Sequence, residues 1–359
     1  SRHILLLIPV GRTPGRVFDG GNRSLENLTI LVTFSVGLGA ALVLGYLAQR
    51  IKLSPIVGYL LAGILVGPST PGIVVDHNIT EQFAEIGVIL MLFGIGLKFH
   101  LKELIAVWKI AVPGALIQSS LATAVLAGIM HLFGMDWVHG IILGMAVSVA
   151  STVVMALVLG EKHDLHARIG HIAIGWTVVE DILTVAMLLL LPIIFGPNGS
   201  GSVEAALAAL GVAGLKIFGL VAIVIVLGKW IIPWILDKIA LTRSRELFTL
   251  AVLVLAIGIA IGAAKLFGVS VALGAFLAGL AVGRSEFATR ASGDAVPMRD
   301  AFTVLFFVSV GMLFNPVSLF EEPVLIGMVL LLVVVVKPLV AMLTVRAMRQ
   351  DWTTAVPVG

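Results

Sequence analysis

The 359-residue chain contains no cysteine, so disulfide bonds, cysteine-ligated metal sites and thiol catalysis are all excluded. Charged residues are scarce as well. They make up 12% of the sequence, about half of their share in an average globular protein, whereas hydrophobic residues make up 59%. The formal net charge is only +3, and the basic residues lie in short segments between apolar runs, which is not the pattern of a nucleic-acid-binding protein. This composition is typical of a membrane protein.

Long apolar runs recur along nearly the whole sequence. A run of at least about 18 residues crosses roughly 30 Å of hydrocarbon as a helix, and these runs lack the alternating pattern of barrel strands. The predicted fold class is therefore an all-α polytopic membrane protein. Eleven helices are predicted, at residues 28–48, 55–67, 83–99, 110–132, 137–159, 169–196, 206–232, 247–267, 270–283, 302–314 and 323–346.

The two ends of the sequence fit this pattern poorly. The tail 1–27 has several arginines around the stretch ILLLIPV, which is too short to span a bilayer, and it stays without a structural prediction. Residues 28–346 are predicted to form the transmembrane domain, and residues 347–359 a C-terminal stub.

Lys and Arg predict the orientation. They gather in the segments that follow the odd-numbered predicted helices, whereas Lys265 alone follows an even-numbered one. Because cytoplasmic loops carry an excess of Lys and Arg, we expect the N-terminus outside and the C-terminus in the cytoplasm. The expected location is a bacterial inner membrane.

The sequence contains an internal repeat. SPIVGYLLAGILVGP (54–68) aligns without gaps with SVALGAFLAGLAVGR (270–284), and ILMLFGIGLKF (89–99) resembles VLFFVSVGMLF (304–314) at nearly the same offset. The predicted orientation makes the two copies run in opposite directions, and such inverted repeats are typical of secondary transporters. We expect repeat 1 at about 54–196 and an incomplete repeat 2 from about 270. Because the second copy lacks two helices, about 11 of an expected 13 are present.

An acidic pair interrupts the apolar run GWTVVEDILTVAMLLLLP, where Glu180 and Asp181 lie near the middle of a predicted helix. A charge at the bilayer centre costs about 2.5–3.5 kcal/mol, so these carboxylates need partners. Adjacent residues on a helix diverge by about 100°, so the two side chains face different surroundings. Lys337 lies at a comparable depth in another predicted helix, and we expect it to pair with Glu180, which leaves Asp181 free for an ion.

Four hydroxyl residues are candidates for a supporting role. Thr177 and Thr184 form a polar stripe with the acidic pair, because residues three and four apart share a helix face. Ser151 and Thr152, in the stretch SVASTVVM, either return hydrogen bonds to their own helix or satisfy the backbone where that helix breaks beside an ion site. The residues leave both interpretations open.

A carboxylate at mid-membrane binds either a proton or a dehydrated monovalent cation, and the two compete for one negative charge. Coupled exchange of H⁺ for K⁺ or Na⁺ would then need neither ATP nor a cofactor, and the chain would be a transporter rather than an enzyme. A structural network of Glu180, Asp181 and Lys337 is the alternative interpretation. A channel, an inactive truncated remnant and an intramembrane protease are rivals, but the chain lacks a TVGYG filter, a second clearly central aspartate and an HExxH motif.

The chain resembles the monovalent cation:proton antiporter superfamily, specifically its Kef-type branch, which is related to sodium/proton exchangers. The matching stretches are SPIVGYLLAGILVGP, GVILMLFGIGLKF, SVASTVV, GWTVVED, SRELFTL, VALGAFLAGLAVGRSEF, LFFVSVGM and the lysine of VVKPLV. The resemblance implies inverted five-helix repeats, a core that rocks against a scaffold or dimerisation domain, and a homodimer as an open question. It also implies that Asp181 is the cation and proton carboxylate, with Glu180 in the variable position beside it. Ser151 and Thr152 then lie on the helix that breaks near the site.

Overall fold

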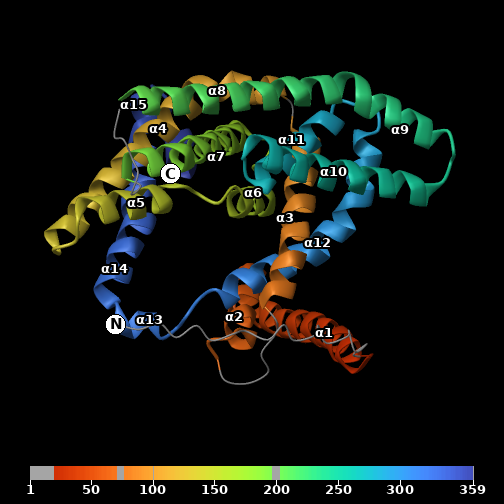
Figure 1. Ribbon diagram of the computed structural model, residues 1–359, viewed down its shortest axis with the longest axis horizontal. Coiled ribbons are helices and arrows are strands. Elements are labelled where there is room, and N and C mark those ends of the chain that lie inside the picture. Colours follow the sequence, from red (N-terminus) through yellow and green to blue (C-terminus); the bar gives the residue numbers. More distant parts are fainter. Residues whose placement is uncertain (1–19, 71–76, 100, 196–202, 359) are drawn as a thin grey trace, which may run out of the picture.

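The computed structural model describes residues 20–70, 77–99, 101–195 and 203–358, which form helices and no strand (Figure 1). Most of the N-terminal tail therefore lies outside the described residues. The first helices are α1 (Gly20–Arg50), α2 (Pro55–Val66), α3 (His77–Lys98), α4 (Leu101–Leu132), α5 (Trp137–Ser148), α6 (Thr152–Glu161) and α7 (Arg168–Phe195). The later ones are α8 (Val203–Val226), α9 (Ile232–Ala240), α10 (Arg245–Phe267), α11 (Val271–Val282), α12 (Ala288–Met312), α13 (Ser318–Glu321), α14 (Pro323–Leu331), α15 (Lys337–Ala347) and α16 (Trp352–Val358).

Within the described residues, seven helical spans are long and apolar enough to cross a membrane. They are Thr80–Lys98, Lys102–Leu132, Trp137–Glu161, Arg168–Leu191, Leu207–Ala240, Arg245–Phe267 and Pro323–Ala347. Two further helices, α2 and α11, are apolar but shorter. The all-α polytopic fold is thus confirmed, whereas the predicted number of eleven spans is not.

The predicted helix 137–159 is broken in the structure. α5 ends at Ser148 and α6 begins at Thr152, and Val149 and Ser151 between them have extended backbone angles. Ser151 is the N-cap of α6, because its hydroxyl accepts a hydrogen bond from the Val154 amide at 3.3 Å. The break leaves carbonyls of α5 and amides of α6 without helical partners in the middle of one span.

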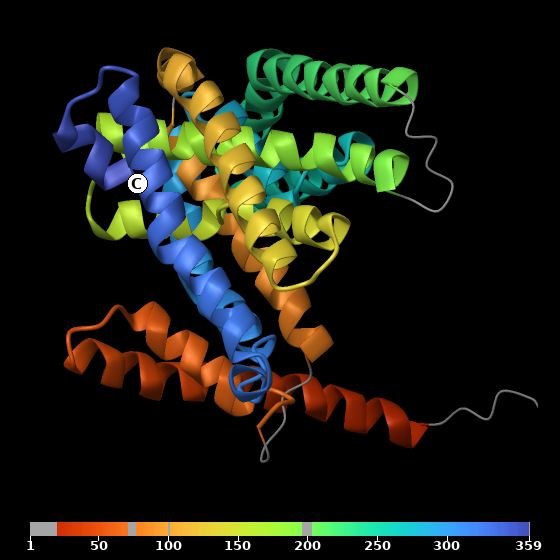
Figure 2. The ribbon, with the colours of Figure 1, turned by 90° about the vertical axis from the view of Figure 1, so that its left-hand side faces the viewer.

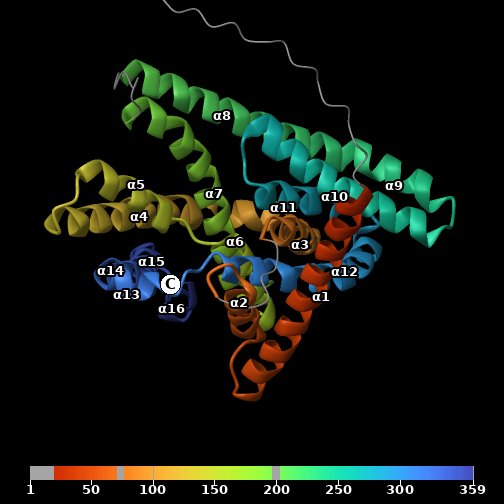
Figure 3. The same ribbon diagram turned by 60° about the horizontal axis from the view of Figure 1, so that its bottom comes forward.

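Glycines bring the repeated helices into close contact. α3 and α12 run side by side, α2 packs on α12, and α11 packs on α3 (Figures 1 and 3). A Cβ on Gly63 would lie 2.8 Å from Gly311 Cα, and a Cβ on Gly279 would lie 2.9 Å from Gly96 Cα. The alignment of the repeats pairs Gly63 with Gly279 and Gly96 with Gly311. The contact between Gly63 and Gly311 in one pair of helices therefore corresponds to the contact between Gly279 and Gly96 in the other. Two copies of one repeat are expected to form equivalent contacts of this kind. The bounds of the two repeats stay a prediction.

A larger side chain at one of these glycine contacts should destabilise the protein. We expect Gly279→Val to lower the stability by about 3 kcal/mol, because its Cβ would overlap the carbonyl oxygen of Phe93 and backbone cannot move aside as a side chain can. The midpoint of thermal unfolding in detergent measures the effect. Gly258→Ala is the control, since a Cβ there meets nothing within 4 Å. Equal midpoints for the two variants would contradict the prediction.

A π-helical turn precedes Lys337 and sets its position. Leu332–Val336 forms this turn, and Lys337 and Pro338 begin α15 directly after it. Proline has no amide hydrogen, and its ring clashes with the carbonyl of the preceding turn, so the helix widens there rather than continuing as a regular α-helix. The same arrangement occurs at Leu227–Ile231, before Pro233. Figure 2 shows α14 and α15, in blue, crossing beside α4.

The predicted C-terminal stub is partly helical. α16 packs against α15 and α7, and its Ala355 and Val358 are buried in a cluster with Val107 and Trp176. Val358, at the end of α16, is part of the wall of the site described next.

Candidate functional site

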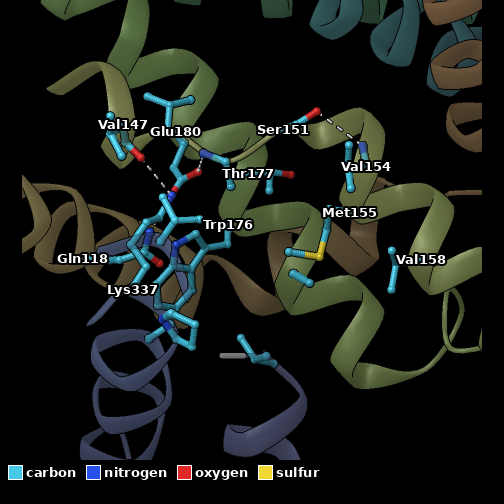
Figure 4. Close-up of a pocket in the computed structure, with 17 residues that line it drawn as sticks. Gln118, Val147, Ser151, Val154, Met155, Val158, Trp176, Thr177, Glu180 and Lys337 are labelled. Carbon is cyan, nitrogen blue, oxygen red and sulfur yellow. Dashed lines mark hydrogen bonds between the residues drawn. The ribbon is translucent and has the colours of Figure 1, made fainter. Parts of the chain in front are cut away.

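A pocket of about 480 Å³ lies at the break between α5 and α6 (Figure 4). Its walls come from α4, the break itself, α6, the first half of α7, the π-helical turn with the start of α15, and the end of α16. The polar and charged side chains of the lining are Gln118, Ser151, Trp176, Thr177, Glu180 and Lys337. Two predicted site residues from distant parts of the sequence, Glu180 and Lys337, thus face one pocket.

Glu180 is completely buried and is held by two donors. The Gln118 side-chain amide donates to Oε1 at 3.1 Å, and the Ala150 backbone amide donates to Oε2 at 2.8 Å. The second bond provides an acceptor for the Ala150 amide, which has no helical hydrogen-bond partner because the helix is broken there. Hydrogen bonds to an ionised acceptor are stronger than neutral ones, so Glu180 fixes both α4 and the break against α7.

Lys337 interacts with the end of α5, on the side of the break opposite α6. Its Nζ donates to the Val147 carbonyl oxygen at 3.3 Å, at the C-terminal end of α5. The expected direct pair with Glu180 is not formed, because no ion pair within 4.0 Å joins these two described residues. Their opposite charges still interact across the pocket.

The two half-helices therefore meet complementary charges. The negative C-terminal end of α5 faces the Lys337 ammonium, and the positive N-terminal end of α6 faces carboxylates of α7. This complementarity lowers the cost of placing both the charges and the free backbone groups in the interior of the protein.

Asp181 faces away from this pocket. The Thr152 hydroxyl donates to its Oδ2 at 3.2 Å, at the first residue of α6. Asp181 is partly exposed, in contrast to its buried neighbour Glu180, and it is absent from the lining of the Glu180 pocket. The predicted divergence of the two carboxylates is thus seen in the structure.

The other predicted hydroxyl residues bond to backbone. Thr177 donates to the Ile174 carbonyl oxygen at 3.1 Å, and Thr184 donates to the Glu180 carbonyl oxygen at 2.9 Å. Ser151 caps α6, as described above. Among the predicted supporting hydroxyls, Thr152 is therefore the one that meets a carboxylate of the site.

Two side chains of the site were not predicted. Gln118 lies inside the predicted helix 110–132, where an amide in an apolar run is the signal that could have revealed it. Trp176 lines the pocket, and its buried indole N–H interacts with the Glu180 carboxylate. Gly114 makes room for that ring, because a Cβ there would overlap it.

A broken membrane-spanning helix whose two ends meet buried charges from other helices defines a class of protein, the membrane transporters with discontinuous helices. Comparison of the sequence with known protein families supports the assignment to this class. Residues 38–359 match the family described as sodium/hydrogen exchanger, transmembrane, and the chain belongs to this family.

Individual relatives agree as well. YbaL from Escherichia coli strain K12, which is named for cation/proton antiport, is 45% identical over 93% of this chain and 61% of its own length. The glutathione-regulated potassium-efflux protein KefC from Enterobacter sp. strain 638 is 31% identical over 86% of this chain and 49% of its own length. The chain thus spans about half to three fifths of these two relatives.

The fold matches a solved structure. The sodium proton antiporter MjNhaP1 from Methanocaldococcus jannaschii superimposes with a TM-score of 0.63, covering 93% of this chain and 85% of that protein, at 17% sequence identity. The chain therefore has the sodium/proton antiporter fold.

Proposed function

We propose that this chain is the membrane domain of a secondary transporter that exchanges protons for a monovalent cation, with Asp181 as the shared site. The observation that carries the proposal is the contrast between the two carboxylates. Glu180 is buried and already accepts two hydrogen bonds, whereas Asp181 is partly exposed and accepts one, from the neutral Thr152 hydroxyl. The Asp181 carboxylate therefore keeps acceptor capacity for a cation or a proton.

The mechanism follows from competition for one charge. A cation that binds Asp181 must shed part of its hydration shell, and the carboxylate and the oxygen atoms around it replace the lost water. A proton on Asp181 removes the charge that holds the cation, so the two ligands alternate. Alternating access then carries each ligand across, through movement of one helix group against the other. No ATP and no redox cofactor enters this cycle.

The names of the relatives suggest K⁺ or Na⁺ as the cation, because KefC is named for potassium efflux and the family for sodium/hydrogen exchange. The clustering of Lys and Arg supports an N-terminus outside and a C-terminus in the cytoplasm. The bacterial sources of YbaL and KefC support the inner membrane as the location.

Flux measurements in proteoliposomes test the proposal. We expect an imposed pH gradient to drive uptake of K⁺ or Na⁺ into vesicles that contain the protein, with no uptake of choline. The same vesicles should collapse a pH gradient when the cation is added. A cation current that needs no pH gradient would instead indicate a channel, and the absence of any flux would contradict the proposal.

A further inference from the structure

Gln118 places a side-chain amide in the middle of the apolar helix α4, where it is only 5% exposed. A buried polar group is costly unless it is hydrogen-bonded, and the Gln118 amide donates to Glu180 Oε1 at 3.1 Å. Gly114, one turn earlier on the same face of α4, leaves the space that the Trp176 ring of α7 fills. The two helices are therefore close enough here for Gln118 to link α4 to the carboxylate that holds the helix break.

The Glu180 carboxylate has both of its oxygen atoms held, and the two donors belong to different elements. Gln118 of α4 donates to Oε1, and the Ala150 amide of the break donates to Oε2 at 2.8 Å. The terminal torsion of a glutamate side chain is broad, so one bond alone does not fix the plane of the carboxylate. The two bonds together fix it, and they thereby fix the Ala150 amide relative to both α4 and α7.

The position of Ala150 also sets the position of Thr152. Two residues of extended backbone span at most about 7 Å, so these two residues cannot move independently. The Thr152 hydroxyl donates to Asp181 Oδ2 at 3.2 Å. Two adjacent residues of α7, Glu180 and Asp181, thus hold the break at two points. A displacement of the Ala150 amide would move the hydroxyl that bonds to Asp181.

We propose that Gln118 is a positioning residue of the ion site, which sets the place of the Thr152 hydroxyl beside Asp181. Its action is indirect, because within the described residues no hydrogen bond joins Gln118 to either of them. The effect passes through the Glu180 carboxylate and the Ala150 amide. This inference rests on the proposed exchange function, which makes Asp181 the ion site.

Replacing Gln118 with methionine tests the proposal, because methionine has nearly the same length but no donor. We expect the apparent KM for K⁺ or Na⁺ in pH-driven exchange to rise about tenfold, with kcat within about twofold of the parent value. The carboxylate of Asp181 remains, but an oxygen atom beside the cation is misplaced. Gln118→His should restore most of the affinity, since its Nε2 has about the reach of the glutamine amide nitrogen. Gln82→Met, the same change at an exposed site of α3, is the control and should match the parent.

A double variant separates positioning from general packing. Thr152→Val removes the hydroxyl but keeps the shape of the side chain, and it should also raise the apparent KM about tenfold. If Gln118 acts through this hydroxyl, Gln118→Met should add little in the Thr152→Val background. Two independent effects would instead multiply to about a hundredfold, which would overturn the inference.

Cation binding can be measured without transport, because a bound cation raises the midpoint of thermal unfolding in detergent. The cation concentration that gives half of this effect should rise in Gln118→Met by the same factor as the apparent KM. Unchanged affinity, or a loss confined to kcat, would overturn the inference. If Gln118→Met does not fold, Gln118→Asn carries the test, since its amide is one methylene too short to reach Glu180. A parent protein that binds the cation without exchanging it would refute the proposed function, whereas the affinities would still decide the role of Gln118.

Discussion

Replacing Asp181 with asparagine should abolish coupled exchange. The substitution keeps the size of the side chain and an oxygen that accepts from Thr152, but it removes the negative charge that holds a cation and the group that binds a proton. A pair of unit charges 4 Å apart near a protein surface interacts by about 4 kcal/mol. Loss of that interaction corresponds to roughly a thousandfold weaker binding. We therefore expect pH-driven K⁺ or Na⁺ uptake by Asp181→Asn vesicles to fall to background.

Asp237→Asn is the matched control, because it makes the same chemical change on an exposed part of α9. Its flux should equal that of the parent. The thermal unfolding midpoint of Asp181→Asn should stay close to the parent value, since the carboxylate has one neutral partner in the structure. Full exchange by Asp181→Asn would show that Asp181 is not the ion site. Glu180→Gln would then be the variant to measure.

The second large effect concerns stability. We expect Lys337→Met to lower the free energy of unfolding by about 3 kcal/mol, because it removes the positive charge that interacts with the buried Glu180 carboxylate across the pocket. The Val147 carbonyl also loses its donor, and Glu180 keeps its charge in a completely buried position. The measurement is thermal or denaturant-induced unfolding in detergent, with Lys109→Met as the control at an exposed site.

A double variant separates the loss of the charge interaction with Glu180 from the loss of the donor to the Val147 carbonyl. In Glu180→Gln with Lys337→Met, the unpaired carboxylate is gone, so part of the lost stability should return. The double variant would then be more stable than the sum of the single changes predicts, which shows that the two charges interact. Strict additivity would mean that Lys337 acts only through the Val147 carbonyl, and the charge complementarity across the break would be wrong.

Most membrane-spanning elements were predictable because their signal is length and hydropathy. The break at residues 149–151 was implied by the family resemblance but not by the residues themselves, because apolar residues continue through it and Val149 and Ala150 are ordinary residues of a buried helix. The hydroxyls of Ser151 and Thr152 fitted two interpretations equally well. What decides between them is the carboxylate of Glu180, which comes from another helix and bonds to the Ala150 amide.

The charged residues of the site were predictable for an energetic reason. Glu180, Asp181 and Lys337 stand out in the sequence because a charge in the bilayer is costly. Their partners do not stand out. The Ala150 amide and the Val147 carbonyl belong to the backbone, which every residue has, so the sequence gives no sign of which ones are used. The pairing of Glu180 with Lys337 was expected as a direct contact, but the Lys337 ammonium bonds to the Val147 carbonyl and interacts with Glu180 only across the pocket.

The different surroundings of Glu180 and Asp181 also bear on the energy source of transport. In the proposed exchange, Asp181 is the carboxylate that alternates between a cation and a proton, while Glu180 stays bonded to Gln118 and to the Ala150 amide. We propose that one cation then moves one way for each proton that moves the other way, so that no net charge crosses the membrane. A membrane potential contributes about 2.3 kcal/mol for each net charge moved per 100 mV, and it contributes nothing to a one-for-one exchange. Such a carrier runs on concentration gradients alone and stops when the cation ratio equals the proton ratio.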